Sequence, residues 1–317
     1  MTNPGNRVER FRGIIPAVVS PHDGQDNFSV EAFARQIAFL YEQGVHGVYT
    51  CGGTGEGYCM RLEERKNALE VAAELSKSRG VLIDHVGAQC TRDAAELAEH
   101  AARWRADAIA SLPPRGRTQK ELLAYYSALS QASGLPVFVY YMPAITGKSM
   151  GYDELLELLD VDGVVGMKFT DSNLFLMRRL LDARPGIVIF SGFDEMLLPA
   201  MQYGATGGIG TWYNVVPRAF LAIFEAASRG DYKTAWEWQR RVIKLTEFGW
   251  GYGIEGTVEL LLRQQGRVLH AFRRPCVPFD AAFIAETAST LSQILTELES
   301  TDRTNRHPPG SCIDKVG

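Results

Sequence analysis

The sequence predicts an α/β fold, a (β/α)₈ barrel (TIM barrel) that is followed by a C-terminal helical extension. Short β-branched runs alternate with longer segments of helical spacing, and eight such runs fit within about 200 residues, the lower size limit of this barrel. The runs are continuously apolar, as in parallel strands that are buried on both faces. A doubly wound sheet would use fewer strands and a glycine-rich turn after the first, where this chain has Pro21-His-Asp-Gly24.

Each expected strand except the last leads into an expected helix with one apolar face. In the first helix, for example, Phe33, Ile37 and Leu40 recur at the spacing of one helical face. The expected strands are Gly13–Ser20, Gly47–Thr50, Val81–Val86, Ala108–Ser111, Val137–Tyr141, Val164–Phe169, Ile187–Ser191 and Gly207–Gly210. The expected helices are Val30–Gln43, Arg61–Ser78, Thr91–Trp104, Gln119–Ser133, Tyr152–Leu159, Leu174–Leu181 and Asp194–Gln202.

After the eighth strand the alternation stops and only helical patterns follow, with glycine and proline as breaks between them. These helices are expected at Pro217–Arg229, Tyr232–Phe248, Glu255–Gln264 and Asp280–Ser300. We therefore expect the barrel over residues 1–211, the extension over residues 212–300 and a disordered tail over residues 301–317, which is polar and carries Pro308-Pro309-Gly310.

The composition excludes several classes of protein. The net charge of -4 argues against a general nucleic-acid binder. No apolar run approaches the ~20 residues of a membrane span, and the N-terminus lacks the apolar core of an export signal. The five cysteines show no metal-ligand spacing, so we expect reduced thiols and no metal site; they are Cys51, Cys59, Cys90, Cys276 and Cys312. These features indicate a cytoplasmic globular protein without a nucleic-acid or membrane partner.

Lys168 is the most informative residue, because it is the one lysine of the sequence inside an apolar strand. The active site of a barrel lies at the carboxyl ends of its strands, which is where Val164–Phe169 ends. Burial favours the neutral amine, and a neutral amine can form a Schiff base with a ketone. The alternative is a structural lysine that pairs with a carboxylate or extends to solvent.

Three other motifs follow expected strands at the same rim. Thr50-Cys-Gly-Gly-Thr-Gly-Glu-Gly57 can direct backbone N–H groups at an anion, or it can be a tight turn without a ligand. Val139-Tyr-Tyr-Met-Pro143 offers a hydroxyl for proton transfer, or a pair of packed aromatic rings. Asp194 and Glu195 can bind polar substrate groups or cap a helix. The glycines of Gly204–Thr211 also leave open a phosphate- or flavin-binding barrel.

Taken in order, these motifs resemble the dihydrodipicolinate synthase/N-acetylneuraminate lyase family. The resemblance runs from Arg12 to Pro278 and rests on five runs: Gly-Gly-Thr-Gly-Glu (52–56), Tyr-x-x-Pro (140–143), Gly-Met-Lys-Phe-Thr (166–170), Ser-Gly-Phe-Asp-Glu (191–195) and Gly-Ala-Thr-Gly-Gly-Ile-Gly (204–210). It implies a class I (Schiff-base) lyase that acts on a pyruvate-type 2-oxo acid, in a homotetramer and without a metal or organic cofactor.

The resemblance also implies roles for individual residues. Lys168 would form the Schiff base, Tyr140 would be the acid/base, and Thr54 would join them as the third catalytic group. Substrate binding would fall to the carboxylate-binding pair Gly53 and Thr54, to Ile209 in the pyruvate pocket, and to Thr170, Gly192, Asp194, Glu195 and Thr211 around the substrate tail.

Departures from the family pattern bear on which branch the chain resembles. Ile145 stands where dihydrodipicolinate synthases carry the arginine that binds a second carboxylate, so the chain is more similar to the N-acetylneuraminate lyases. Gly53 stands where those lyases have serine, and Leu112–Gly116 lacks the tyrosine of the family's proton relay. We therefore predict an N-acetylneuraminate lyase-like enzyme. The alternatives are a keto-deoxy sugar-acid dehydratase, a dihydrodipicolinate synthase-like enzyme, or a non-catalytic barrel that binds 2-oxo acids.

Overall fold

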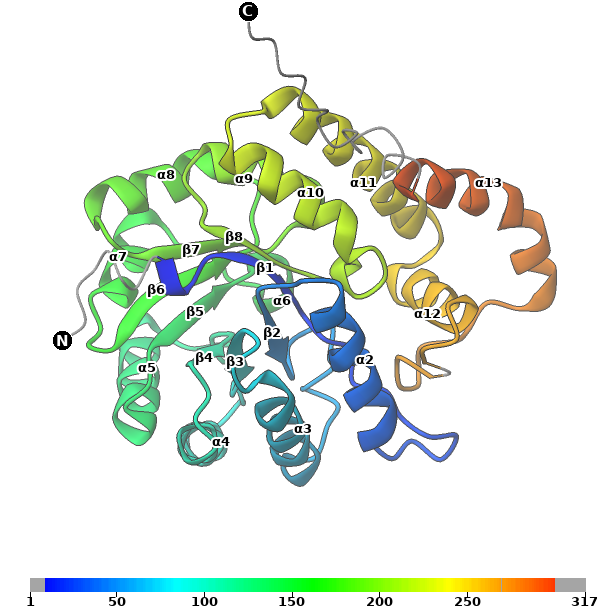
Figure 1. Ribbon diagram of the computed structural model, residues 1–317. Coiled ribbons are helices and arrows are strands. Elements are labelled where there is room, and N and C mark those ends of the chain that lie inside the picture. The colour runs from blue at the N-terminus through cyan, green and yellow to red at the C-terminus, as the bar shows by residue number, and fades with distance from the viewer. Residues whose placement is uncertain (1–8, 269, 300–317) are drawn as a thin grey trace, which may run out of the picture.

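The computed structural model of the protein describes residues 9–268 and 270–299 (Figure 1). Its centre is a sheet of eight parallel strands, and the helices that connect them surround it. The strands are β1 (Gly13–Pro16), β2 (Gly47–Thr50), β3 (Val81–His85), β4 (Ala108–Ser111), β5 (Val137–Tyr141), β6 (Val164–Phe169), β7 (Val188–Ser191) and β8 (Gly207–Gly210). The expected tail over residues 301–317 lies outside the described residues.

The sheet curls into a nearly closed barrel. Its order is β1-β8-β7-β6-β5-β4-β3-β2, so β1 and β2 are its two ends. These ends meet at a parallel bridge between Ala17 and Tyr49, where the Val18 amide donates to the Tyr49 carbonyl at 2.9 Å. The inward side chains form one apolar core, and the outward ones pack against the helices in a second. The predicted (β/α)₈ barrel is confirmed.

The helices around the barrel start where the sequence offers caps. The Ser29 side chain accepts from the Ala32 amide at the start of the first helix, and Thr118 forms a capping box with Glu121 at another. These helices are α2 (Val30–Glu42), α3 (Leu62–Ser76), α4 (Thr91–Arg103), α5 (Gln119–Ser133), α6 (Pro143–Thr146), α7 (Tyr152–Leu159), α8 (Leu174–Ala183) and α9 (Leu197–Gln202).

Three elements near the barrel mouth differ from the expectation. β1 ends at Pro16 rather than Ser20, because from Ala17 the chain leaves β8 and crosses to β2. The seventh helix begins as a 3₁₀ turn, η1 (Asp194–Met196), and its α-helical part places Pro199 in the first turn, where a missing N–H is tolerated. The short helix α6 directly after β5 was not expected from the sequence.

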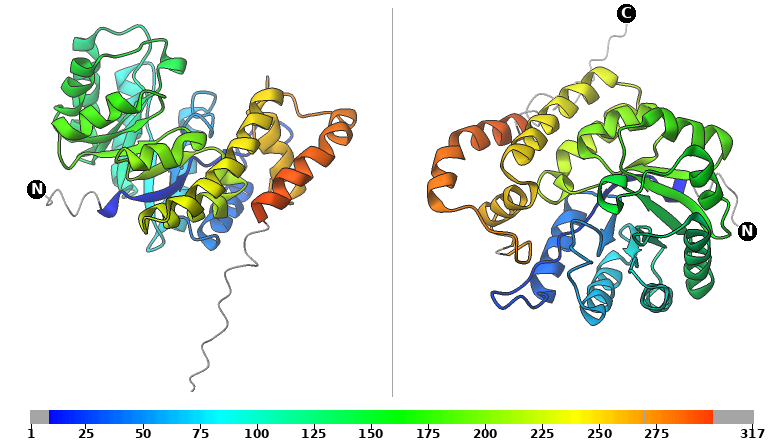
Figure 2. Two further views of the ribbon diagram at one scale, coloured as in Figure 1. Left: turned by 90° about the horizontal axis from the view of Figure 1, so that it is seen from above. Right: turned by 180° about the vertical axis from the view of Figure 1, so that it is seen from behind.

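The extension consists of four helices on one side of the barrel (Figures 1 and 2). They follow the short 3₁₀ turn η2 (Trp212–Asn214) and are α10 (Pro217–Ser228), α11 (Tyr232–Tyr252), α12 (Ile254–Gln264) and α13 (Ala281–Glu299). α11 continues past the expected end at Phe248. Gly249 lies within it, and a side chain there would place its Cβ 2.5 Å from the Trp212 ring. The glycine therefore serves close packing between α11 and η2, not a helix end.

A buried polar network fastens the extension to the barrel. The Arg267 guanidinium donates to the Gln36 side chain at 3.0 Å and to the Asn214 carbonyl at 2.7 Å. The Asn214 side chain in turn donates to the Ala17 carbonyl and accepts from the Val19 amide. In the described part of the chain, no helix is long and apolar enough to cross a membrane.

Candidate active site

Lys168 and Tyr140 lie side by side at the carboxyl ends of β6 and β5. The two residues are direct partners in the parallel pairing of these strands. Lys168 is only 4% exposed, and its Nζ lies 4.2 Å from the centroid of the Tyr140 ring. Within the described residues no carboxylate lies within ion-pairing distance of this amine. The structure therefore disfavours the reading of Lys168 as half of a structural ion pair.

The hydroxyl of Tyr140 lacks a strong hydrogen-bond partner. Its recorded bond is to the Met142 thioether, at 3.2 Å, and sulfur is a weak acceptor. A side chain at Gly53 would meet only this hydroxyl, with the Cβ 3.9 Å from it. The space between Gly53 and Tyr140 is therefore open to a water molecule or to a substrate group.

The glycine-rich turn after β2 has a backbone that larger residues could not adopt without shifts. A Cβ on Gly57 would lie 2.0 Å from the Cys51 carbonyl oxygen, and one on Gly52 would lie 2.3 Å from the Tyr49 ring. In the described part of the chain, the amides of Gly53 and Thr54 donate to no protein acceptor. Two adjacent free N–H groups at the barrel mouth are suited to an anion such as a carboxylate.

Thr54 connects this turn to the other side of the mouth. Its hydroxyl and that of Thr211, just after β8, are 2.7 Å apart and share a hydrogen bond. The bond joins residues 157 positions apart. Thr54 and Thr211 thus lie together at the mouth, whereas among the described residues Thr54 makes no hydrogen bond to the Tyr140 hydroxyl.

Of the acidic pair after β7, Asp194 is buried and Glu195 is half-buried. Asp194 is 5% exposed, one of its oxygens accepts from the Trp212 amide at 2.7 Å, and the other has no partner. Burial raises the pKa of Asp194 to about 7, and it also raises the pKa of Glu195. Asp194 is therefore a carboxyl group that can donate or accept a hydrogen bond near neutral pH.

Thr170, Gly192 and Ile209 line the same region. The Thr170 hydroxyl is buried without a partner, and a Cβ on Gly192 would lie 1.7 Å from it. A glycine at position 192 is therefore needed for the Thr170 side chain to fit. Ile209 belongs to the inward-facing core of the barrel and is 1% exposed.

Two inward-facing residues were missed by the sequence analysis. The Tyr49 ring lies 5.0 Å from the Lys168 Nζ, and the His85 ring lies 6.1 Å from the Tyr140 ring. His85 Nε2 accepts from the Leu112 amide at 3.1 Å, and burial, followed by the charges of Arg65 and Lys168, holds the pKa of His85 well below its usual range. The alternation of inward and outward residues along β2 and β3 was the signal that could have found them.

The β4 side of the mouth contributes no aromatic hydroxyl from the segment Leu112–Gly116. Arg115 is exposed, and its amide donates to the Gln89 side chain at 3.1 Å. Among the described residues, no group of three or more His, Cys, Asp or Glu side chains is arranged to hold a metal ion.

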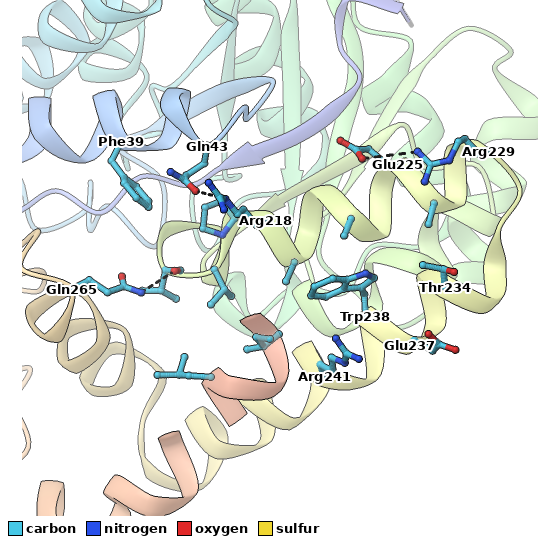
Figure 3. A pocket seen from close by; sticks show the side chains of 18 residues that line it. Phe39, Gln43, Arg218, Glu225, Arg229, Thr234, Glu237, Trp238, Arg241 and Gln265 are labelled. Atoms are coloured by element: carbon cyan, nitrogen blue, oxygen red, sulfur yellow. Dashed lines mark hydrogen bonds and ion pairs between the residues drawn. The ribbon is translucent and has the colours of Figure 1, made fainter. Parts of the chain in front are cut away.

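A separate cavity of about 740 Å³ lies among the helices of the extension (Figure 3). Its walls come from α10, α11, α13 and the end of α2, and they carry Trp238 and the ion pair of Glu225 with Arg229. None of the residues that the sequence predicted for the site lines this cavity. It is therefore a feature of the extension and not part of the barrel mouth.

Comparisons with known proteins agree with this geometry. The model of the dihydrodipicolinate synthetase family matches residues 10–294. The N-acetylneuraminate lyase of Citrobacter koseri is 30% identical over 291 residues, which cover 90% of this chain and 98% of that protein.

Solved structures give the same result. A catalytic lysine mutant of the Ruminococcus gnavus sialic acid aldolase superposes with a TM-score of 0.88 at 25% identity, over 95% of this chain and 99% of that one. CdNal from Clostridium difficile, solved in complex with mannosamine, gives a TM-score of 0.84 at 29% identity, over 91% of this chain and 99% of that one.

Proposed function

The chain belongs to the dihydrodipicolinate synthetase family of class I lyases, and on this premise we propose that Lys168 is its Schiff-base lysine, in an enzyme that cleaves a sugar-derived 2-oxo acid into pyruvate and an aldehyde. The observation that carries the proposal is the buried amine of Lys168, which lies beside the Tyr140 ring without a carboxylate partner in the described part of the chain. An amine that is desolvated but not paired is poised for nucleophilic attack.

The first steps form the covalent intermediate. The substrate carboxylate accepts hydrogen bonds from the free amides of Gly53 and Thr54, which directs its C2 carbonyl toward Lys168. The amine adds to C2, and loss of water from the resulting carbinolamine gives a cationic iminium. No cofactor is required in this proposal, because the iminium itself is the electron sink.

Tyr140 then moves the proton that cleavage requires. Its hydroxyl passes its own proton to a water molecule while its oxygen takes the proton of the C4 hydroxyl. The C3–C4 bond breaks, which releases an aldehyde and leaves an enamine on Lys168. The enamine takes a proton at C3, and water hydrolyses the new iminium to release pyruvate. The same steps in reverse condense pyruvate with an aldehyde.

The polar side of the mouth supports a hydroxylated substrate tail. Asp194, Glu195 and Thr211 lie there, together with the unpartnered hydroxyl of Thr170. Ile145 is half-exposed and brings no positive charge for a second carboxylate. This combination favours a sugar acid, with an amino sugar such as mannosamine as a model for the aldehyde half.

A second candidate is a keto-deoxy sugar-acid dehydratase, because the run Gly-Gly-Thr-Gly-Glu (52–56) resembles those enzymes more than the lyases, which carry serine at position 53. The space beside the Tyr140 hydroxyl is open at Gly53, and the β4 segment brings no tyrosine to it. Both reactions begin with the same iminium, so they diverge only after Lys168 has reacted. We further propose a homotetramer, which the family resemblance implies, and a cytoplasmic location, which the composition indicates.

Trapping the iminium tests the proposal directly. The protein is incubated with pyruvate and sodium borohydride, and its intact mass is measured. We expect one adduct, heavier by the mass of pyruvic acid less one oxygen atom, because borohydride reduces the iminium to a stable amine. Lys168→Ala should give none, while Lys148→Ala, which removes a lysine from the loop after α6, should label like the wild type. A wild-type protein that gains no mass would refute the Schiff-base function.

A further inference from the structure

The amine of Lys168 faces two aromatic rings rather than one. Its Nζ lies 4.2 Å from the centroid of the Tyr140 ring and 5.0 Å from that of Tyr49. The two rings are nearly perpendicular to each other, at 88° with centroids 6.5 Å apart. The mechanism above uses the hydroxyl of Tyr140 but assigns nothing to Tyr49.

Tyr49 is an unusual residue for packing alone. It is fully buried, and its hydroxyl has no hydrogen-bond partner in the described structure, which is a costly arrangement. On the neighbouring strand β3, the residue paired with it is the aliphatic Ile83, and the His85 ring lies 6.1 Å from its own ring. Gly52 gives up a side chain to make room, since a Cβ there would lie 2.3 Å from the Tyr49 ring. The turn after β2 therefore packs directly against the Tyr49 ring.

The charged groups around Lys168 suggest an electrostatic role for the Tyr49 ring. No carboxylate lies within ion-pairing distance of Lys168 in the described residues, and His85, on the next strand, is held neutral by burial. Asp194 acts on Lys168 only from a longer distance. The faces of the two rings lie over this nitrogen, where they can stabilise a positive charge.

We propose that Tyr49 is a catalytic residue, whose ring face stabilises the cationic iminium on Lys168 relative to the neutral carbinolamine that precedes it. In that step the carbinolamine takes up one proton and loses one water molecule, so the nitrogen gains a full positive charge. A cation near a desolvated ring face is stabilised, whereas a neutral carbinolamine is not. The inference rests on the Schiff-base function proposed above and adds to it a residue for the dehydration step.

The ratio of the two intermediates measures this effect. Pyruvate labelled with ¹³C at C2 is bound at one fixed pH, and the NMR signals of the iminium and of the carbinolamine are compared. Tyr49→Phe keeps the ring face and removes the unpartnered hydroxyl, so its ratio should match the wild type. Tyr49→Leu removes the face, and we expect the iminium to fall by about tenfold relative to the carbinolamine, which corresponds to ~1.4 kcal/mol.

A leucine at position 49 can also disturb the packing of the barrel. A second series of variants therefore keeps the size and shape of the aromatic ring. Phenylalanine at position 49 is replaced by phenylalanines with increasing numbers of ring fluorines, which weaken the negative face with little change in size. We expect the iminium share to fall stepwise along the series. An unchanged ratio in a wild-type-like fold would overturn the role of Tyr49 and leave the Schiff-base function intact. Absence of any adduct in the wild type would overturn both.

Discussion

The two halves of the barrel mouth differ in the kind of group they present. The half built on β5 to β8 carries the amine of Lys168, the hydroxyl of Tyr140 and the buried carboxyl of Asp194. The half built on β2 to β4 presents free backbone amides at Gly53 and Thr54, and two rings, Tyr49 and His85. The first half thus presents polar side chains to the mouth, whereas the second presents backbone amides and ring faces.

This division explains why the departures from the family pattern can coexist with the core chemistry. The absent serine at position 53 and the absent tyrosine after β4 both fall in the half from β2 to β4. In the proposed mechanism the nucleophile, Lys168, lies in the other half. We therefore expect variants at position 53 to change the rate of cleavage without preventing the formation of the Schiff base.

Tyr140→Phe should have the largest effect on turnover and should separate the two steps. The variant keeps the ring beside Lys168 but loses the hydroxyl, so pyruvate should still be trapped by borohydride. The rate of pyruvate release from a sugar-derived 2-oxo acid should fall by about 10²–10⁴-fold, the usual share of a positioned acid/base. Both quantities are measured on the same preparation. A variant that cleaves at the wild-type rate would show that another group moves the proton.

The groups of the half from β5 to β8 were predictable because their signals are local. Lys168 is a charged residue within an apolar strand, and the end of that strand is where the active site of a barrel is expected. Asp194 follows the next strand along the chain. Such residues stand out by type against their immediate neighbours in the sequence, so no knowledge of the pairing between strands is needed to select them.

The other half was predicted less completely because its contacts depend on register. Tyr49 is an ordinary residue for a strand, and only the closure of the barrel brings its ring to Lys168. A register shift between β5 and β6 near Val137 sets Tyr140 opposite Lys168, and no sequence pattern marks it. The glycine turn was recognised by residue type, but the contact of Glu56 with the Arg273 amide spans 217 positions. Such contacts form between segments that are far apart in the sequence, so the sequence of either segment alone does not predict them.

Asp194→Asn tests whether the buried carboxyl of Asp194, in the half from β5 to β8, makes the stability of the protein depend on pH. Folding raises the pKa of Asp194 from 3.8 to about 7, so the folded protein prefers the protonated carboxyl. The protonated carboxyl therefore stabilises the folded state fully at pH values below 3.8, the pKa in the unfolded chain. This stabilisation is lost as the pH rises through about 7. Asparagine does not titrate, and its oxygen can still accept from the Trp212 amide.

Between pH 5 and pH 8 the wild type should therefore lose stability relative to Asp194→Asn, by at most ~3 kcal/mol. The free energy of unfolding in urea is measured for both proteins at both pH values. Other buried acids, such as Asp84 with a pKa of about 6, titrate in both proteins and cancel in the difference. Parallel pH profiles would mean that Asp194 is not held protonated by the fold.

Gly53→Ser should have the smallest effect, and it tests whether the half from β2 to β4 lacks a hydroxyl that limits cleavage. A Cβ at position 53 would meet only the Tyr140 hydroxyl, at 3.9 Å, so a serine fits and can replace Met142 as its partner. One added hydrogen bond is worth about 0.5–1.5 kcal/mol, so cleavage should accelerate by at most about tenfold. Gly53→Ala adds the same carbon without the hydroxyl and should leave the rate unchanged. If serine and alanine have equal effects, the open space at Gly53 is occupied by water or substrate that already supplies this bond.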